Sequence, residues 1–115
     1  MFSFGRRRTP EITVDELDAL LGGGAAVVDV REDWEFREGH VPGAIPVPLG
    51  RLAHEVSTLP RDRRVLVICR SGHRSLAATD FLLARGFDGA ASVAGGTLEW
   101  ARTGRPLEGA AARVA

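Results

Sequence analysis

The sequence predicts an α/β domain built on a parallel sheet of four or five strands, with helices on both faces. Three observations point to this fold: short apolar, β-branched runs recur along the chain, helix-like segments lie between them, and 115 residues suffice for one domain with a buried core. Short, continuously apolar strands that alternate with helices are typical of a parallel sheet covered on both sides.

The strands are predicted where apolar residues cluster in short runs. These runs are residues 26–30, 44–47, 65–69 and 91–94. Ile12 and Thr13 could add a short extra strand. Pro46 lies inside the second run, and proline has no backbone N–H to donate to a neighbouring strand. We therefore expect that strand to be short or to lie at an edge of the sheet.

The helices are predicted from apolar spacing and from start and stop signals. Thr13 and Glu16 match a capping box, and the helix that they begin should end at the glycines of residues 22–24. The remaining helices are expected at residues 49–59, 76–85 and 98–101. Pro60 follows the first of these three and should end it, because the residue before a proline is biased away from helical geometry.

The composition excludes several classes of protein. Hydrophobic residues make up 44% and charged residues 26% of the chain, which is ordinary for a globular domain and argues against disorder. The formal net charge is zero, with 15 basic residues, all of them Arg, against 15 acidic ones. This balance argues against nucleic acid as a partner. No apolar run approaches the ~20 residues of a membrane span, and no secretory signal is recognisable, so we expect a cytoplasmic protein. The oligomeric state is open, and a monomer is the default expectation.

The predicted domain covers residues 10–108 and is flanked by two segments with little to bury. Residues 1–9 read as a flexible N-terminal arm, and residues 109–115 read as a flexible tail. The arm carries Arg6, Arg7 and Arg8. A solvated face is the ordinary interpretation of such a run, and a patch that binds phosphate or a partner is the alternative.

The segment around the single cysteine, Cys69, carries the clearest chemical signal. A buried strand is expected to deliver Cys69 to its carboxyl end, and a helix is expected soon after it. The loop that links Cys69 to this helix, together with the start of the helix, consists of Arg70, Ser71, Gly72, His73, Arg74 and Ser75. Loop N–H groups, the helix N-terminus and two arginines all favour a thiolate over a thiol, so Cys69 is a candidate nucleophile. The alternative is a buried structural cysteine, which the flanking arginines disfavour.

Three motifs in this order resemble the rhodanese family of sulfurtransferases. The first spans residues 29–45, with Asp-Val-Arg, then Glu-Phe, then Gly-His-Val-Pro-Gly-Ala. The second is the loop Cys-Arg-Ser-Gly-His-Arg-Ser at residues 69–75. The third is Gly-Gly-Thr-Leu-Glu-Trp at residues 95–100, followed by Gly-Arg-Pro at 104–106. Together with the predicted alternation of strands and helices, the resemblance covers about residues 11 to 108.

The resemblance implies sulfur transfer through a persulfide on Cys69, from a donor such as thiosulfate to cyanide or a thiol. Arg70 and Arg74 would hold the anionic donor, the loop amides of residues 70–75 would cradle the persulfide, and no metal or organic cofactor would be needed. The chain has no second cysteine, so an external thiol or nucleophile must accept the sulfur. A sulfur-relay protein is a further candidate partner.

Two alternatives remain on the same fold. One is a non-catalytic binding or regulatory module. The other is a cysteine-dependent phosphatase or arsenate reductase, whose pattern spaces the cysteine and arginine one residue further apart. Here only residues 70–73 separate Cys69 from Arg74, which makes a narrower cradle that suits a single sulfur atom.

Other polar residues are expected in supporting roles. Asp29 and Arg31 follow a predicted strand at the ligand end of the sheet, where Asp29 could brace the catalytic loop and Arg31 could pair with a carboxylate such as Glu35. His73 could contact the donor or point to solvent. His40 is expected to be a structural hydrogen-bonding residue at a turn.

Aromatic and basic residues outside the loop have mainly structural interpretations. Trp34 and Phe36 are expected in or near the core, with pocket lining as the alternative. Trp100 should pack its helix against the sheet. The arginines before the strand that leads to Cys69 read as a solvated turn, with a docking patch for an acidic partner as the alternative; they are Arg61, Arg63 and Arg64.

Overall fold

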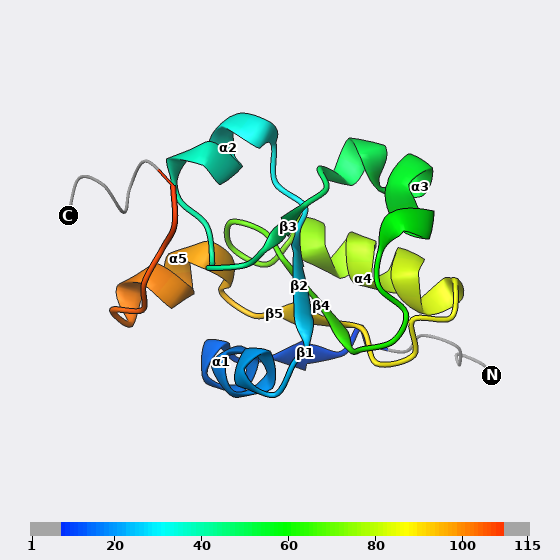
Figure 1. Ribbon diagram of the computed structural model, residues 1–115, viewed down its shortest axis with the longest axis horizontal. Helices are drawn as coiled ribbons and strands as arrows, with labels where there is room; N and C mark the ends of the chain where they lie inside the picture. Colours follow the sequence, from blue (N-terminus) through cyan, green and yellow to red (C-terminus); the bar gives the residue numbers. More distant parts are fainter. Residues whose placement is uncertain (1–7, 110–115) are drawn as a thin grey trace.

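A computed structural model describes residues 8–109 of the chain. In chain order its strands and α-helices are β1 (Glu11–Ile12), α1 (Val14–Gly22), β2 (Ala26–Asp29), α2 (Asp33–Glu38), β3 (Ile45–Pro46), α3 (Leu52–Glu55), β4 (Val65–Ile68), α4 (Arg74–Ala84), β5 (Ala91–Val93) and α5 (Gly96–Arg102). Figure 1 shows the strands in the middle and the helices around them. Most of the expected arm, with Arg6 and Arg7, and most of the expected tail lie outside the described residues.

The strands form one parallel sheet, as the sequence predicts. Their order is β1-β5-β4-β2-β3, and every neighbouring pair is parallel. The short extra strand exists but begins one residue earlier than expected, at Glu11. Pro46 lies in β3 at an edge of the sheet, beside Asp29 of β2, which confirms the expectation from its missing N–H group.

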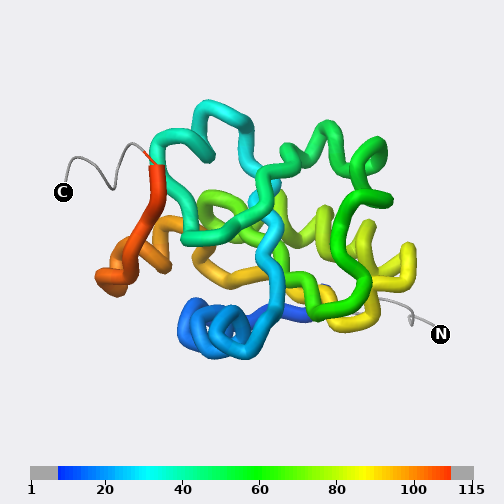
Figure 2. Tube along the Cα trace, viewed as in Figure 1, coloured from blue at the N-terminus to red at the C-terminus, as the bar shows by residue number. Residues whose placement is uncertain are grey.

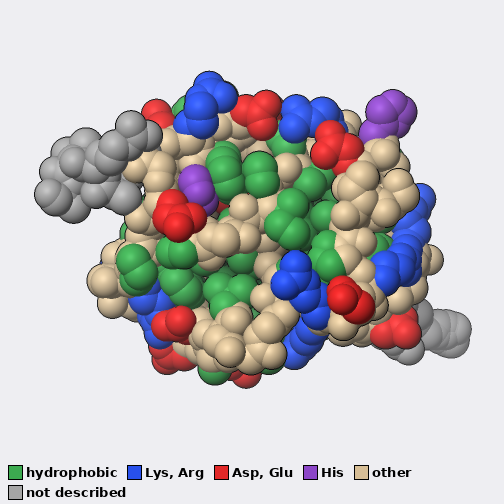
Figure 3. Space-filling model, in the orientation of Figure 1, with side chains coloured by type: hydrophobic (Ala, Val, Ile, Leu, Met, Phe, Trp, Pro, Cys, Tyr) green, Lys and Arg blue, Asp and Glu red, His purple; other side chains and the backbone are tan. Residues whose placement is uncertain are grey.

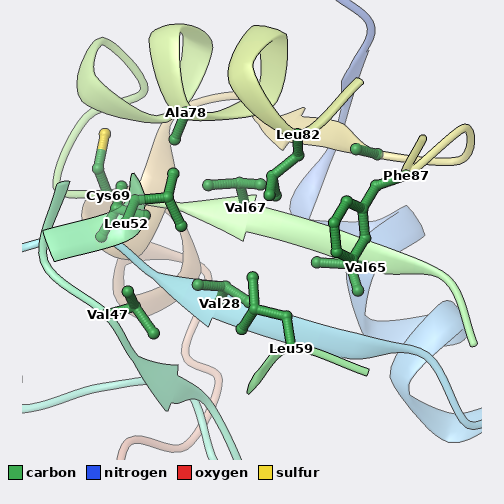
Figure 4. Packing of buried hydrophobic residues seen from close by; sticks show 12 residues of the cluster. Val28, Val47, Leu52, Leu59, Val65, Val67, Cys69, Ala78, Leu82 and Phe87 are labelled. Carbon is green, nitrogen blue, oxygen red and sulfur yellow. The ribbon is translucent and has the colours of Figure 1, made fainter. Parts of the chain in front are cut away.

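Helices cover both faces of the sheet. On one face, Leu52 of α3 and Leu82 of α4 join Val67 of β4 in a single buried cluster, which Figure 4 shows from close by. On the other face, Leu17 of α1 and Trp100 of α5 belong to a second buried cluster. Complete burial of one such aliphatic side chain stabilises a fold by roughly 1.5–3 kcal/mol, so these two clusters hold the helices on the sheet.

Capping residues and apolar spacing in the sequence predict three helices correctly and a fourth only approximately. At the start of α1, Thr13 Oγ1 accepts from Glu16 N at 3.1 Å and Thr13 N donates to Glu16 Oε1 at 2.8 Å, which confirms the capping box. The helices α4 and α5 lie where apolar spacing predicts them. The helix expected at residues 49–59 is instead the four-residue α3 between two 3₁₀ turns. A glycine near its start and β-branched or hydroxyl residues near its end weaken a continuous helix there.

One helix, α2, was not anticipated from the sequence. It follows Arg31 and covers six mostly polar residues, so it has no apolar stripe to reveal it. Its start is held by Glu32 N, which donates to Glu35 Oε1 at 3.0 Å. This helix matters because it brings a carboxylate to the ligand end of the sheet.

Three separate segments meet at the carboxyl ends of β2 and β4, where a parallel sheet offers its ligand site. Figure 2 traces the chain from β4 through residues 69–73 into α4. Hydrogen bonds join this loop to the start of α5, and Arg74 at the start of α4 bonds to α2. On the face drawn in Figure 3, acidic and basic side chains are interspersed around hydrophobic ones. Within residues 8–109, no helix combines the length and the hydropathy that crossing a membrane would require.

Candidate active site

The position of Cys69 is fixed by the sheet on one side and by α5 on the other. Cys69 directly follows β4 and is only 1% exposed. Its carbonyl oxygen accepts from Thr97 N at 2.9 Å and from Thr97 Oγ1 at 3.1 Å, and Leu98 N donates to Arg70 O at 3.1 Å. The start of α5 therefore satisfies the carbonyl oxygens of Cys69 and Arg70.

Gly96 allows this close approach of α5 to the loop. Its φ is +59°, and a Cβ atom at this position would lie 2.5 Å from the carbonyl oxygens of both Cys69 and Arg70. No side chain fits at that distance. The second glycine of the closing motif thus has a direct structural reason: it lets two segments that are remote in sequence pack backbone against backbone.

The sulfur of Cys69 lies among hydrogen-bond donors, as the sequence predicts. Gly72 N donates to Sγ at 3.2 Å, Ser75 N donates at 3.4 Å, and Ser75 Oγ lies 3.4 Å away. Gly72 has φ +109°, a conformation that favours glycine, and this turn directs its N–H at the sulfur. The three contacts come from the loop and from the first turn of α4, where backbone N–H groups have no partner within the helix.

These contacts change the acidity of the thiol. Burial raises the pKa of Cys69, but hydrogen bonds from the Ser75 side chain and from the backbone of Ser75, Gly72 and Ser71 outweigh burial and lower it below its ordinary value. A lowered pKa increases the fraction of thiolate at neutral pH, and the thiolate is the nucleophilic form. The loop can therefore stabilise a negative sulfur.

Arg74 does not point freely into the site. Its guanidinium donates to Glu35 Oε1 at 2.7 Å and to Glu35 Oε2 at 3.0 Å, so α2 and α4 are joined by a bidentate ion pair. The Arg74 hydrogen bonds lower the pKa of Glu35 to about 2, against a smaller opposing effect of burial. The hydrogen bond to Glu35 raises the pKa of Arg74, and the charge of Cys69 adds to this.

Arg31 pairs with a carboxylate, as expected, but its partner is Asp29 and not Glu35. Arg31 folds back on Asp29, donating from Nε at 3.0 Å and from Nη2 at 2.8 Å, and a second Nη2 bond goes to Gly39 O at 2.8 Å. Both side chains are buried. Among residues 8–109, the hydrogen bonds that Asp29 Oδ atoms accept come from Arg31, so Asp29 braces its own strand end and not the loop after Cys69.

Three loop residues are exposed, and one of them borders a pocket. Ser71 and His73 are exposed, so the structure places His73 toward solvent. Arg70 is exposed as well and lines a cavity of about 280 Å³ between α2 and α5. The same cavity is lined by Trp34 and Leu98, which are 57% and 47% exposed. The expectation that Trp34 packs in the core is wrong, and its alternative as a pocket residue is correct.

Comparison with known proteins agrees with this geometry. The sequence model of the rhodanese-like domain family matches residues 13–103. This chain belongs to that family. A sulfurtransferase of Allochromatium vinosum is 36% identical over 93 residues, covering 81% of each chain. The chloroplastic thiosulfate sulfurtransferase 16 of Arabidopsis thaliana is 36% identical over 109 residues, covering 84% of this chain and 91% of its own.

The solved structures give the same result. A rhodanese-related protein from Thermoplasma volcanium superposes on this rhodanese-like domain with a TM-score of 0.81 and 32% identity, over 86% of this chain and 97% of its own. The family and these relatives support a sulfurtransferase kind of activity.

The remaining residues singled out in the sequence are structural in this rhodanese-like domain. His40 Nδ1 donates to Phe36 O at 2.7 Å, and the two rings stack 3.6 Å apart. Trp100 is 3% exposed and donates from Nε1 to Pro106 O at 2.7 Å. Among the described residues, no group of three or more His, Cys, Asp or Glu side chains could hold a metal ion.

The basic turn before β4 is held by the backbone of the segment that precedes β5. Arg61 Nη1 donates to Arg85 O at 3.0 Å, and Arg64 Nε donates to Gly89 O at 2.6 Å. Both arginines stay exposed. The turn therefore agrees with the solvated interpretation, and it lies at the opposite end of β4 from Cys69.

Three site residues were not recognised as such in the sequence. Glu35 was seen only as a partner for Arg31, Thr97 only as part of a motif, and Ser92 not at all. Ser92 lies on β5 with its Oγ 2.7 Å from Ser75 Oγ. A serine in the middle of a buried strand was the available signal, because buried hydroxyl groups need a hydrogen-bond partner.

Proposed function

We propose that this domain is a sulfurtransferase that carries a sulfane sulfur as a persulfide on Cys69. The observation that carries the proposal is the environment of Cys69 Sγ, where Gly72 N and Ser75 N donate to the sulfur and Ser75 Oγ lies within hydrogen-bond distance. Such a cradle stabilises a thiolate before the reaction, and it can stabilise a negatively charged persulfide after it.

The proposed reaction has two displacement steps, and neither needs a proton transfer. In the first, the Cys69 thiolate attacks the outer sulfur of thiosulfate, the donor's S–S bond breaks, and sulfite leaves with its electron pair. In the second, an acceptor attacks the outer sulfur of the persulfide, the persulfide bond breaks, and the Cys69 thiolate is regenerated. With cyanide as the acceptor the product is thiocyanate.

The anionic donor would be received by the arginines of the loop. Arg70 is exposed beside the pocket, so its guanidinium can donate to the sulfonate oxygens of thiosulfate and to departing sulfite. Arg74 contributes positive charge near the sulfur while each of its terminal nitrogens donates one hydrogen bond to Glu35. The name of the Arabidopsis relative adds support for thiosulfate as a donor.

The acceptor would be an external thiol or a protein of a sulfur relay. Cys69 is the single cysteine of the chain, so a second thiol in the same chain is not there to resolve the persulfide. We place the reaction in the cytoplasm, where free thiols remain reduced. A monomer is sufficient, because the donors around Cys69 come from one chain.

Turnover of thiosulfate and cyanide tests the proposal against its two alternatives. We expect thiocyanate from the wild-type protein and none above background from Cys69→Ser. Turnover of an aryl phosphate that vanadate inhibits, without thiocyanate, would replace the proposal with a phosphatase. Neither activity, from folded protein with reduced Cys69 and with several sulfane donors tried, would instead indicate a binding module.

A further inference from the structure

A second buried hydroxyl group extends the cradle beyond the loop. Ser92 lies on β5, is fully buried, and has its Oγ 2.7 Å from Ser75 Oγ. Ser75 is equally buried, and its Oγ lies 3.4 Å from Cys69 Sγ. The three side chains come from β5, from α4 and from the end of β4, so they form a chain of contacts across three elements.

Counting protons fixes the direction of each contact in this chain. A thiolate can only accept, so Ser75 donates its single hydroxyl proton to Cys69 Sγ, and its oxygen then accepts the proton of Ser92. With Cys69 as a thiol, S–H donates to Ser75 Oγ and Ser75 donates to Ser92. The two hydroxyl groups thus reverse their direction when Cys69 ionises. The thiolate state pairs both hydroxyl protons, whereas in the thiol state the contacts among the described residues leave the Ser92 proton without an acceptor.

Ser92 favours the ionised state because of how hydrogen bonds polarise one another. A hydroxyl whose oxygen already accepts a hydrogen bond donates more strongly, and a bond to a charged sulfur gains more from this than a bond between neutral groups. We propose that Ser92 is a positioning residue, which donates to Ser75 Oγ and thereby directs the Ser75 proton onto the Cys69 thiolate. Its part in catalysis rests on the proposed sulfur transfer.

The variant Ser92→Ala removes this donor, and Thr79→Val is its matched control. Thr79 is also fully buried and also touches Ser75, but its Oγ1 donates to the carbonyl oxygen of Ser75 at 2.7 Å and not to the hydroxyl. Both changes delete one buried hydroxyl beside the same residue. Only the hydroxyl group of Ser92 contacts the Ser75 hydroxyl group, which in turn contacts the sulfur.

The measurement is the pH dependence of Cys69 alkylation by iodoacetamide, with thermal unfolding followed in parallel. Ser92→Ala should raise the pKa of Cys69 by roughly half a unit, which slows alkylation about threefold at pH values below both pKa values. Thr79→Val should leave the profile unchanged. A purely structural role for Ser92 would lower the unfolding temperature without moving the pH profile.

Two further results separate this inference from the proposed function. An unchanged pH profile in Ser92→Ala, with wild-type protein that makes thiocyanate, overturns the role of Ser92 alone. A raised pKa in Ser92→Ala, with wild-type protein that transfers no sulfur, confirms the contact with the thiolate but overturns its part in sulfur transfer. The variant Ser92→Thr, which keeps the hydroxyl group, should restore the wild-type profile if it folds.

Discussion

Glu35 of α2 holds both terminal nitrogens of Arg74, at 2.7 and 3.0 Å, and thereby ties a polar helix to the first turn of α4. The two residues lie 39 positions apart in the sequence. This pair compensates the charge of one loop arginine and leaves Arg70 as the exposed one. The site is therefore less positive than its sequence of two arginines suggests.

Removing Arg74 should impair the reaction through the carboxylate that it leaves behind. Arg74→Ala takes a positive charge from beside Cys69 and leaves Glu35, which is only 8% exposed, negative and unpaired near an anionic donor. We expect kcat/KM for thiosulfate to fall roughly tenfold or more. Steady-state kinetics at several thiosulfate concentrations measure this.

The double variant and a distant arginine control that experiment. Adding Glu35→Gln to Arg74→Ala should recover part of the lost kcat/KM, because the repelling carboxylate is gone. Arg85→Ala, at the other end of α4 and exposed to solvent, should leave the kinetics unchanged. Unaltered thiosulfate kinetics in Arg74→Ala would show that Arg74 has no electrostatic part in the reaction.

The same pair should make stability depend on pH in acid. The pKa of Glu35 falls from 4.5 to about 2 in the folded protein. Between these two pH values the folded protein therefore binds fewer protons at Glu35 than the unfolded chain does. The stabilisation is complete above pH 4.5 and is lost as the pH falls toward 2. Because Arg74 is partly exposed, about 1–2 kcal/mol is a fair expectation after solvent screening.

Denaturant unfolding at a series of pH values checks this. The free energy of unfolding of the wild-type protein should decline between pH 4.5 and 2 more steeply than that of Glu35→Gln. Parallel curves for the two proteins would mean that the ion pair contributes nothing measurable to stability.

Gly96→Ala should disturb the loop without touching a catalytic atom. The new Cβ would lie 2.5 Å from Cys69 O and Arg70 O, so α5 and the loop must separate. We expect a loss of about 1–3 kcal/mol in stability and a large loss of thiocyanate production. Gly50→Ala is the control, since nothing lies within 4 Å of its Cβ and its change should stay within about 0.5 kcal/mol. Equal behaviour of the two variants would refute the account of the α5 contact.

The parts of the fold that could be predicted are those with local causes. The buried strands β2 and β4 are mostly apolar runs, and the start of α1 depends on two residues three positions apart. The loop after Cys69 could be recognised because its glycine, its donors and its helix lie next to one another in sequence. These features need no knowledge of what the rest of the chain does.

The parts that could not be predicted depend on long-range contacts. Several carboxylates lie near Arg31 in the sequence, and Arg31 pairs with Asp29 at the buried end of β2 rather than with Glu35. Glu35 forms its ion pair with Arg74 instead, and these two residues come close only when the sheet has folded. Ser92 of β5 contacts Ser75 of α4, and no sequence pattern predicts this contact.

Intact mass after brief incubation with thiosulfate tests the central claim most directly, with Cys69→Ser treated in parallel. The account predicts that the wild-type chain gains the mass of one sulfur atom, that cyanide removes it, and that the variant gains nothing. A wild-type chain with reduced Cys69 that gains no sulfur from thiosulfate, or a variant that gains it equally, would contradict the proposal that Cys69 carries the sulfur.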